Sequence, residues 1–234
     1  MSFLVETKRF RLQQTKEQAF NTDTILLSDF ISVPKGCKNI LDIGTGSGVL
    51  MFDLANKTSA NIQGIEIQKN RYLQALGNIE LNDYKERVNV VLGDVRDYKF
   101  DVLFDLIISN PPFFKVVDDK RLSHKTEDKL SRHEVSLSLE ALLKSASKNL
   151  KYRGYFYMVH RPDRLNEIIL LCGKYNLAIK KIRFVHPYVN SDANHVLIMA
   201  IKNGGEGIKV LNPLVLYEEK HVLTAEIKKI IGDF

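Results

Sequence analysis

Short apolar runs of strand length alternate along this chain with stretches of helical periodicity, and this alternation constrains the fold more than any other feature. Strands joined by helices of about 10–15 residues form crossover units, which make a sheet mostly parallel and place helices on both of its faces. We therefore predict an α/β fold with a doubly wound sheet. The expected strands lie at residues 39–43, 62–67, 88–92, 104–109, 154–160, 177–184 and 195–201. The expected helices lie near 49–55, 71–82, 134–149 and 161–175.

The length of 234 residues suits one large domain. A chain of this size buries roughly 70–75% of its unfolded surface and supports its own core. We expect residues 1–234 to form that single domain. A helical lead-in is expected at 1–36, with its helix over about 16–31. A mobile charged loop is expected at 115–132 and a C-terminal appendage at 204–234.

Composition argues against several classes of protein. The longest apolar run, residues 196–201, is far shorter than the about 20 residues of a membrane span. The start of the sequence lacks the apolar centre of a signal peptide, so we expect a cytoplasmic protein. Two cysteines are too few for a disulfide framework or a Cys-based zinc site, and the six histidines show no metal-ligand spacing. We therefore expect no metal.

The first expected strand runs into a glycine-rich turn, Asp-Ile-Gly-Thr-Gly-Ser-Gly at residues 42–48. Glycines at this place permit a tight turn and let a ligand approach the backbone N–H groups at the start of the next helix. Val49 stands where a dinucleotide-binding G-x-G-x-x-G motif has its third small residue, so the spacing favours a different nucleoside cofactor. A tight turn without any ligand explains the same residues when they are taken alone.

Carboxylates follow the next two expected strands. Glu66 ends the second strand, about 20 residues beyond the turn, where an acid can accept hydrogen bonds from both hydroxyls of a ribose. Asp94 ends the third strand, and its oxygens suit an adenine amino group. Taken alone, either acid also fits an exposed strand end. Because the carboxyl ends of parallel strands share one edge, we expect the turn and both acids to converge on one ligand crevice.

The fourth expected strand runs directly into Asn110, Pro111, Pro112 and Phe113. The prolines restrict the backbone, and Pro111 favours an extended conformation at Asn110. A side-chain oxygen and a backbone carbonyl are thereby fixed as two acceptors in one place, with an aromatic ring beside them. The alternative is a rigid turn with a core phenylalanine. That alternative does not explain why a buried strand ends at the edge that carries the acids.

The net charge of +6 is unevenly distributed along the chain. Residues 144–183 contain ten lysines and arginines against two acids, so their excess of positive charge exceeds that of the whole chain. Solvated helix faces would produce this pattern, and so would a surface that attracts polyanions. Charge alone favours neither interpretation.

The turn, the two acids and residues 110–113 resemble those of class I S-adenosylmethionine-dependent methyltransferases of the amine-methylating type, which carry an N-P-P-[FY] motif. More narrowly, the chain resembles the bacterial tRNA1(Val) (adenine-N6)-methyltransferase family over nearly its whole length. The N-P-P-F motif indicates amine methylation, whereas flanking segments indicate the tRNA family. Those segments are residues 20–27, 132–134, 160–165, 183–187, 212–217 and 223–227. Asn21 and Thr22, which precede Asp23, depart from the family's pattern.

The resemblance implies a seven-stranded, Rossmann-like methyltransferase sheet with S-adenosylmethionine as the cofactor. It implies methylation of the N6 amine of an adenine in tRNA, adenine-37 beside the anticodon of tRNA1(Val). The implied catalytic residues are Asn110, Pro111, Pro112 and Phe113. The implied cofactor-binding residues are Asp42, Gly44, Thr45, Gly46, Gly48, Glu66, Ile67, Asp94, Val95 and Asn110.

The same resemblance implies how the reaction proceeds. The methyl donor is a sulfonium, so the displacement needs alignment more than strong acid–base groups. The adenine amine is a poor nucleophile because its lone pair is delocalised into the ring. Hydrogen bonds to the Asn110 oxygen and the Pro111 carbonyl would localise that lone pair, and Phe113 would stack on the extruded base.

The expected partner is the anticodon stem-loop of tRNA, bound by a monomeric enzyme. Arg161 and Arg164 follow the strand that ends at His160, so we expect them to meet phosphates near the extruded base. Basic residues of the charged loop are expected to close over the RNA from the other side. Those in the predicted site are Lys115, Arg121 and Arg132.

Other functions stay open at this point. The same motif serves methylation of a protein glutamine amide, although the residues ahead of the first strand are too few for the helical domain of such enzymes. Methylation of DNA adenine would call for a target-recognition domain that the sequence does not show, and an amine of rRNA is a further alternative. A scaffold that binds the cofactor without catalysis is disfavoured by the intact motif at residues 110–113.

Overall fold

The computed structural model describes residues 2–15, 21–112 and 137–234. The charged loop expected at 115–132 lies outside the described residues, and so do some of the predicted site residues. These are Phe113, Lys115, Arg121 and Arg132.

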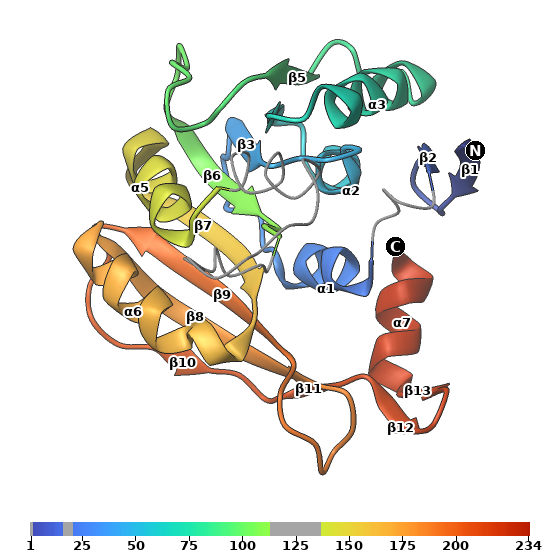
Figure 1. Cartoon of the computed structure of the whole chain (residues 1–234), viewed down its shortest axis with the longest axis vertical. Helices are drawn as coiled ribbons and strands as arrows, with labels where there is room; N and C mark the ends of the chain where they lie inside the picture. The colour runs from blue at the N-terminus through green and yellow to red at the C-terminus, as the bar shows by residue number, and fades with distance from the viewer. Residues whose placement is uncertain (1, 16–20, 113–136) are drawn as a thin grey trace, which may run out of the picture.

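A single mixed sheet forms the centre of the molecule (Figure 1). Its long strands are β3 (Asn39–Ile43), β4 (Asn61–Glu66), β5 (Val88–Leu92), β6 (Phe104–Ser109), β7 (Leu150–His160), β8 (Leu177–His186) and β9 (His195–Lys202). Within the described residues the sheet has nine strands, because the short β10 (Lys209–Val210) and β11 (Leu214–Val215) both pair with β8.

The strand order is β10-β8-β9-β7-β6-β3-β4-β5. The strands from β5 across to β7 are parallel to their neighbours, whereas β9 runs antiparallel to both β7 and β8. The prediction of a doubly wound, mostly parallel, seven-stranded α/β sheet is therefore confirmed for the long strands. The two short strands extend its β8 edge.

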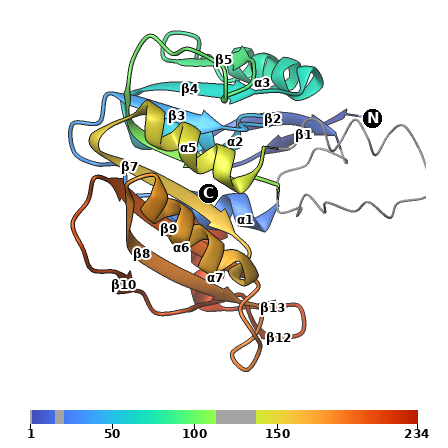
Figure 2. The same cartoon turned by 60° about the vertical axis from the view of Figure 1, so that its left-hand side comes forward.

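Helices cover both faces of this sheet (Figure 2). One face carries α5 (Leu139–Asn149) and α6 (Leu165–Lys174), which follows the 3₁₀ turn η2 (Pro162–Arg164). The other face carries α1 (Thr22–Phe30), α2 (Val49–Lys57), α3 (Lys69–Leu81) and α7 (Ala225–Asp233). Leu106 and Ile108 of β6 pack on the α1 side and Ile107 packs on the α5 side, all fully buried. A central parallel strand is apolar at successive positions because both of its faces are covered.

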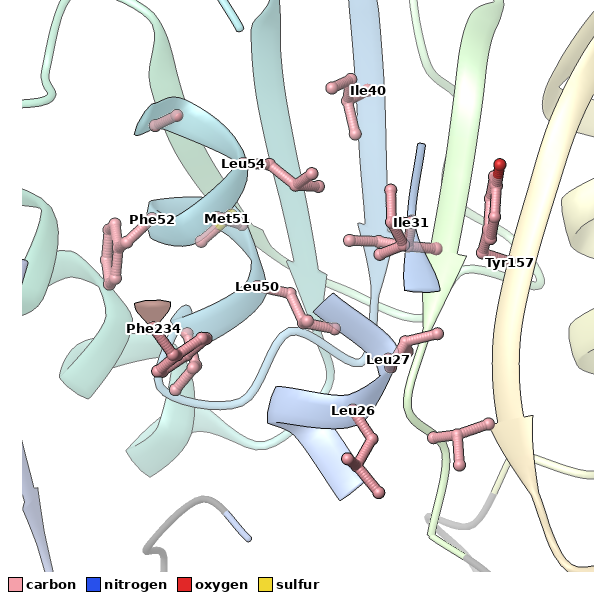
Figure 3. Close-up of a cluster of buried hydrophobic side chains, with 14 of the residues drawn as sticks. Leu26, Leu27, Ile31, Ile40, Leu50, Met51, Phe52, Leu54, Tyr157 and Phe234 are labelled. Carbon is pink, nitrogen blue, oxygen red and sulfur yellow. The ribbon is translucent and has the colours of Figure 1, made fainter. Parts of the chain in front are cut away.

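Helix α1 is held against the sheet by apolar contacts (Figure 3). Leu26 and Leu27 belong to the same buried cluster as Ile40 of β3 and Tyr157 of β7. Burying one side chain of this size contributes about 1.5–3 kcal/mol. The Tyr157 hydroxyl also donates a hydrogen bond of 3.2 Å to the carbonyl of Ser32, just beyond the helix. These contacts fix α1 relative to β3 and β7.

The chain ahead of α1 differs from the helical lead-in that we expected. Strands β1 (Ser2–Glu6) and β2 (Arg11–Thr15) form an antiparallel hairpin, so the helical assignment was wrong for this segment. Phe10, Leu12 and Gln14 are buried while the residues between them are exposed. That spacing is the period of two that a strand requires.

Polar contacts dock the hairpin on the helices of the α1 side. The backbone N–H of Gln13 donates to Asn78 Oδ1 of α3 at 2.7 Å. The fully buried Asp53 of α2 pairs with Arg9 at 2.5 Å and with Lys57 at 2.6 Å. A buried carboxylate requires such partners, so the hairpin turn is tied to the domain.

The C-terminal segment returns to the same face of the molecule. After β11 it forms a small hairpin of β12 (Tyr217–Glu219) and β13 (Val222–Leu223), followed by α7. Ile227 and Ile230 of α7 are buried, and the Phe234 ring meets the Phe10 ring edge-on at 5.4 Å between centroids. Residues from the two ends of the sequence therefore share one core with α1.

Candidate active site

The strand order creates a crevice beside the carboxyl end of β3. The chain builds β3, β4 and β5 outward in one direction and then returns to β6 on the other side of β3. Ligands of open α/β sheets bind at such a reversal of strand order. A cavity of about 590 Å³ lies at this point. Among its lining residues are Asn21, Thr24, Asp42, Gly44, Thr45, Gly46, Glu66, Ile67, Arg71, Asp94, Val95, Asn110, Pro111, Pro112 and Arg161.

The glycine turn forms the floor of this cavity. Gly44 and Gly46 have φ values of 73° and 60°, in the left-handed region that glycine adopts without steric cost. The Gly46 N–H donates to Glu66 Oε2 at 2.9 Å, which links the turn to the end of β4. Gly48 is not among the lining residues. With φ at 93° and an added Cβ only 2.8 Å from the Phe52 ring, Gly48 shapes the start of α2 instead.

Asp42 is an almost fully buried acid at the wall of the cavity. Thr45 Oγ1 donates to its Oδ2 at 2.7 Å, but no described residue donates a hydrogen bond to the buried Oδ1. Burial, opposed by the Thr45 hydrogen bond and reinforced by the charge of nearby Glu66, raises the Asp42 pKa to about 7. An orphaned carboxylate oxygen in this place fits a ligand that brings a donor or a positive charge.

The other two acids differ in how they are held. Glu66 is buried and accepts backbone N–H groups from Gly46 and Gln68, each at 2.9 Å. A carboxylate has about four acceptor sites, so acceptor capacity remains for hydroxyls of a ligand. Asp94 accepts hydrogen bonds from the Arg96 guanidinium, which lower its pKa while partial burial opposes them. Ile67 and Val95 add apolar wall, so the residues present fit a nucleoside with a positively charged group.

Asn110 stands on the opposite side of the crevice, directly after β6. Its Nδ2 donates to Thr24 Oγ1 of α1 at 2.9 Å, across a gap of 86 positions in the sequence. The preceding Ser109 hydroxyl donates to the carbonyl of Ile43 at 2.8 Å and ties β6 to β3. Because the amide nitrogen of Asn110 is engaged, its Oδ1 is the atom left to accept a hydrogen bond from a ligand. Pro111 and Pro112 line the cavity beside it.

The two predicted RNA-binding arginines have different surroundings. Arg161 lines the cavity, keeps 57% of its side chain exposed, and lies 3.6 Å from a carboxylate oxygen of Asp163. Arg164 is 15% exposed and is held by both oxygens of Glu167, at 2.6 and 2.9 Å. It lines an adjoining cavity of about 370 Å³ together with His160, whose pKa is lowered by burial and by the charge of Arg164. Arg161 is therefore the more exposed and less tightly paired of the two arginines.

Several lining residues were not predicted from the sequence. Asn21 and Thr24 come from the start of α1, and their segment had only indicated a resemblance. Arg71 lies in the first turn of α3, with its Nη1 3.4 Å from a Cβ added to Gly46. Its buried Nε has no hydrogen-bond partner among the described residues. The available signal for Arg71 was a basic residue in the first turn of the helix that follows a strand-end acid.

The described segments contain neither a cluster of metal-ligating side chains nor a membrane-spanning helix. Within residues 2–15, 21–112 and 137–234, no group of three or more His, Cys, Asp or Glu side chains is placed to hold a metal ion. In the same segments, no helix has both the length and the apolar character needed to cross a membrane.

Solved structures share this fold. A predicted O-methyltransferase from Agrobacterium tumefaciens superposes with a TM-score of 0.71 at 22% identity, covering 91% of this chain and 96% of that one. The TYW2 protein of P. horikoshii, solved in complex with MeSAdo, gives 0.61 at 13% identity, covering 87% of this chain and 72% of that one. At these identities the likeness establishes the fold alone.

Sequence comparison is more specific. A family model described as a methyltransferase domain matches residues 35–206. The tRNA1(Val) (adenine(37)-N6)-methyltransferase of Porphyromonas gingivalis is 32% identical over 203 residues, covering 81% of this chain and 77% of that protein. The protein of the same name from Tolumonas auensis is 35% identical over 167 residues, covering 70% and 68%. That from Phocaeicola vulgatus is 29% identical over 213 residues, covering 91% and 88%. The chain therefore has a methyltransferase domain and belongs to the tRNA1(Val) (adenine(37)-N6)-methyltransferase family.

Proposed function

We propose that the protein transfers a methyl group from S-adenosylmethionine to the N6 amine of adenine-37 in tRNA1(Val). The names of the relatives from P. gingivalis and T. auensis support this activity. One observation in the structure supports it most directly. Thr24 holds the amide nitrogen of Asn110, which leaves the Asn110 oxygen as an acceptor for a substrate amine at the cavity wall.

On the amine side of the crevice, the proposed task is to make adenine N6 nucleophilic. S-adenosylmethionine supplies an electrophilic methyl group on a positively charged sulfur. Asn110 Oδ1 and the Pro111 carbonyl would each accept a hydrogen bond from one N6–H, so the nitrogen lone pair would be drawn out of the ring and the developing positive charge would be stabilised until N6 releases one proton to solvent. Because the proline ring restricts the backbone angle φ of Pro111, the direction of its carbonyl is also restricted. Phe113, outside the described residues, is proposed to stack on the extruded base.

On the cofactor side, the proposed task is to hold the methyl donor in line with that amine. The backbone of Gly44, Thr45 and Gly46 admits close approach, and the unpartnered oxygen of Asp42 suits a positively charged group. Glu66 is proposed to accept the ribose hydroxyls. The remaining acceptor capacity of Asp94 is assigned to the adenine amino group, and Ile67 and Val95 are assigned to apolar contact with the nucleoside.

For the tRNA, Arg161 is the favoured phosphate contact because it borders the crevice and stays exposed. Arg164 is proposed as a weaker contact, since Glu167 already neutralises it. Phosphate contacts give affinity, whereas the choice of adenine comes from the pocket around Asn110. A tRNA substrate also supports a cytoplasmic location, and we propose that the enzyme acts as a monomer.

The decisive experiment is methyl transfer from labelled S-adenosylmethionine to unmodified tRNA1(Val) transcripts. We expect label in the transcript with adenine-37 and none in a transcript with guanine at that position. Digestion and mass spectrometry should identify the product as N6-methyladenosine. Equal labelling of both transcripts would contradict the proposed target nucleotide.

Parallel assays separate the other functions. Ribosomal RNA, duplex DNA and total protein are offered in the same reaction, and transfer to one of these without transfer to tRNA would replace the proposed substrate. A cofactor-binding scaffold would bind S-adenosylmethionine in calorimetry and label none of the acceptors.

A further inference from the structure

We infer that Asp23 and His195 are positioning residues for the Asn110 carboxamide, acting through a chain of side-chain hydrogen bonds. The inference rests on the proposed methyl transfer, because Asn110 is the group whose orientation they set. It assigns a role to Asp23 of α1 and to strand β9, neither of which the proposed reaction otherwise uses.

The contacts run from the crevice to β9 without a gap. Asn110 Nδ2 donates to Thr24 Oγ1 at 2.9 Å, and Thr24 Oγ1 donates to Asn21 Oδ1 at 3.4 Å. Asn21 Nδ2 donates to Asp23 Oδ2 at 2.9 Å. Asp23 Oδ1 in turn lies 3.1 Å from His195 Nε2. The chain thus joins β6, α1 and β9, which are far apart in the sequence.

The chemistry of its members gives this chain a single direction. A carboxylate only accepts hydrogen bonds, so Asp23 forces the amide nitrogen of Asn21 toward itself. The Asn21 oxygen must then face Thr24, and the Thr24 hydroxyl hydrogen is used on that oxygen. Only a lone pair of Thr24 remains for Asn110, so Thr24 selects the amide nitrogen of Asn110 and excludes its oxygen.

Asp23 and His195 act from behind the cavity wall. Asn21, Thr24 and Asn110 line the cavity, whereas Asp23 and His195 are not among the lining residues. Asp23 is 8% exposed, and His195 Nε2 lies against the carboxylate oxygen that Asn21 does not use. Leu26 and Leu27 anchor α1 independently of this chain. This chain of hydrogen bonds therefore controls the orientation of the Asn110 amide more than the position of α1.

Steady-state kinetics on matched variants test the chain. Asp23→Asn replaces the accept-only group with one that also donates, and Thr24→Val removes the hydroxyl. We expect each to lower kcat about tenfold while the Kd for S-adenosylmethionine and the KM for tRNA stay within about twofold, because misorientation of a reacting contact reduces rate more than binding. Thr24→Ser keeps the hydroxyl and should retain kcat. Asp29→Asn makes the same charge change at an exposed site of the same helix and should behave like the parent.

Coupling and a spectroscopic signal separate positioning from general structural damage. Asp23→Asn combined with Thr24→Val should have the kcat of Thr24→Val alone, since the chain is already cut. The side-chain amide signals of Asn110, identified as those absent from the Asn110→Ala spectrum, should shift in Asp23→Asn and in His195→Ala but not in Asp29→Asn. Additive losses of kcat, or unshifted signals in Asp23→Asn, would overturn the inference. Failure of the parent to methylate tRNA would refute the proposed function, and the amide signals would still decide this inference.

Discussion

The two sides of the crevice are built in different ways. The cofactor side is made of short contiguous pieces, because the turn at 42–48 carries its own backbone geometry and the acids stand where β4 and β5 end. The amine side is assembled from α1, β6 and β9, whose contacts join residues tens of positions apart. This difference separates two tasks. Local backbone geometry suits the holding of a ligand, whereas a long-range polar chain suits the aiming of one reactive group.

The strongest test of this division is Asn110→Ala. We expect turnover with tRNA to fall by at least about 100-fold, the scale for losing one acceptor that acts in the transition state. The Kd for S-adenosylmethionine, measured by calorimetry, should change by less than about threefold, because the cofactor side is intact. Parallel losses in binding and turnover would show that the two sides are not separable.

The burial of the Asp42 carboxyl on the cofactor side should make the free energy of unfolding depend on pH. Burial raises the Asp42 pKa from 3.8 to about 7, so between these values the folded protein keeps a proton that the unfolded chain has released. The contribution of Asp42 to stability is therefore full below about pH 4 and is lost as the pH rises through 7. Relative to Asp42→Asn, the free energy of unfolding of the parent should fall by about 2–3 kcal/mol between pH 5 and pH 8.

Denaturant unfolding at those two pH values measures this effect. Adding S-adenosylmethionine should reduce the loss at pH 8, since a bound positive charge favours ionised Asp42. A difference between parent and variant that is the same at both pH values would remove Asp42 from this account.

Glu66 tests whether binding can be weakened without affecting rate. Glu66→Ala leaves ribose hydroxyls and the Gly46 N–H without an acceptor, so the Kd for S-adenosylmethionine should rise by about 10- to 100-fold, or about 1–3 kcal/mol. Turnover at saturating cofactor should stay near that of the parent. Glu66→Gln, which keeps one acceptor oxygen, should lie between the two. Unchanged affinity in calorimetry would place the ribose elsewhere.

The smallest expected effect concerns the rim of the crevice. Arg161→Ala should weaken tRNA binding about two- to fivefold and reduce the slope of log K against log salt by about 1, as for one lost phosphate contact. Arg164→Ala should do less, because Glu167 already pairs with it. Lys85→Ala serves as the control, because Lys85 precedes the first residue of β5, at the end of that strand away from the crevice. This variant should leave the slope unchanged. Equal slopes for Lys85→Ala and Arg161→Ala would move the RNA away from this rim.

What the sequence could predict follows the same division. The alternation of strands and helices, the glycine turn and the acids at strand ends are local patterns, so the fold and most residues that line this wall of the cavity could be predicted from the sequence. The partnership of Asn110 with Thr24 depends on how α1 packs on the sheet, and no pattern of spacing contains that information. The hairpin ahead of α1 was missed, although its buried residues Phe10, Leu12 and Gln14 alternate with exposed ones. Gly48 was assigned to the ligand, yet it is not among the residues that line the cavity, and a Cβ at this position would meet the Phe52 ring.

The meeting of the two chain ends also bears on the order in which this protein can fold. The buried residues of α7 and Phe234 pack in the same core as Phe10 and α1, so these contacts join residues that lie about 200 positions or more apart in the sequence. Contacts of that kind form late because a long loop must close before they contribute. During synthesis, a nascent chain would have completed the glycine turn and most of the sheet while α1 was still uncovered. The ability to bind cofactor is therefore expected to precede the ability to aim the amine.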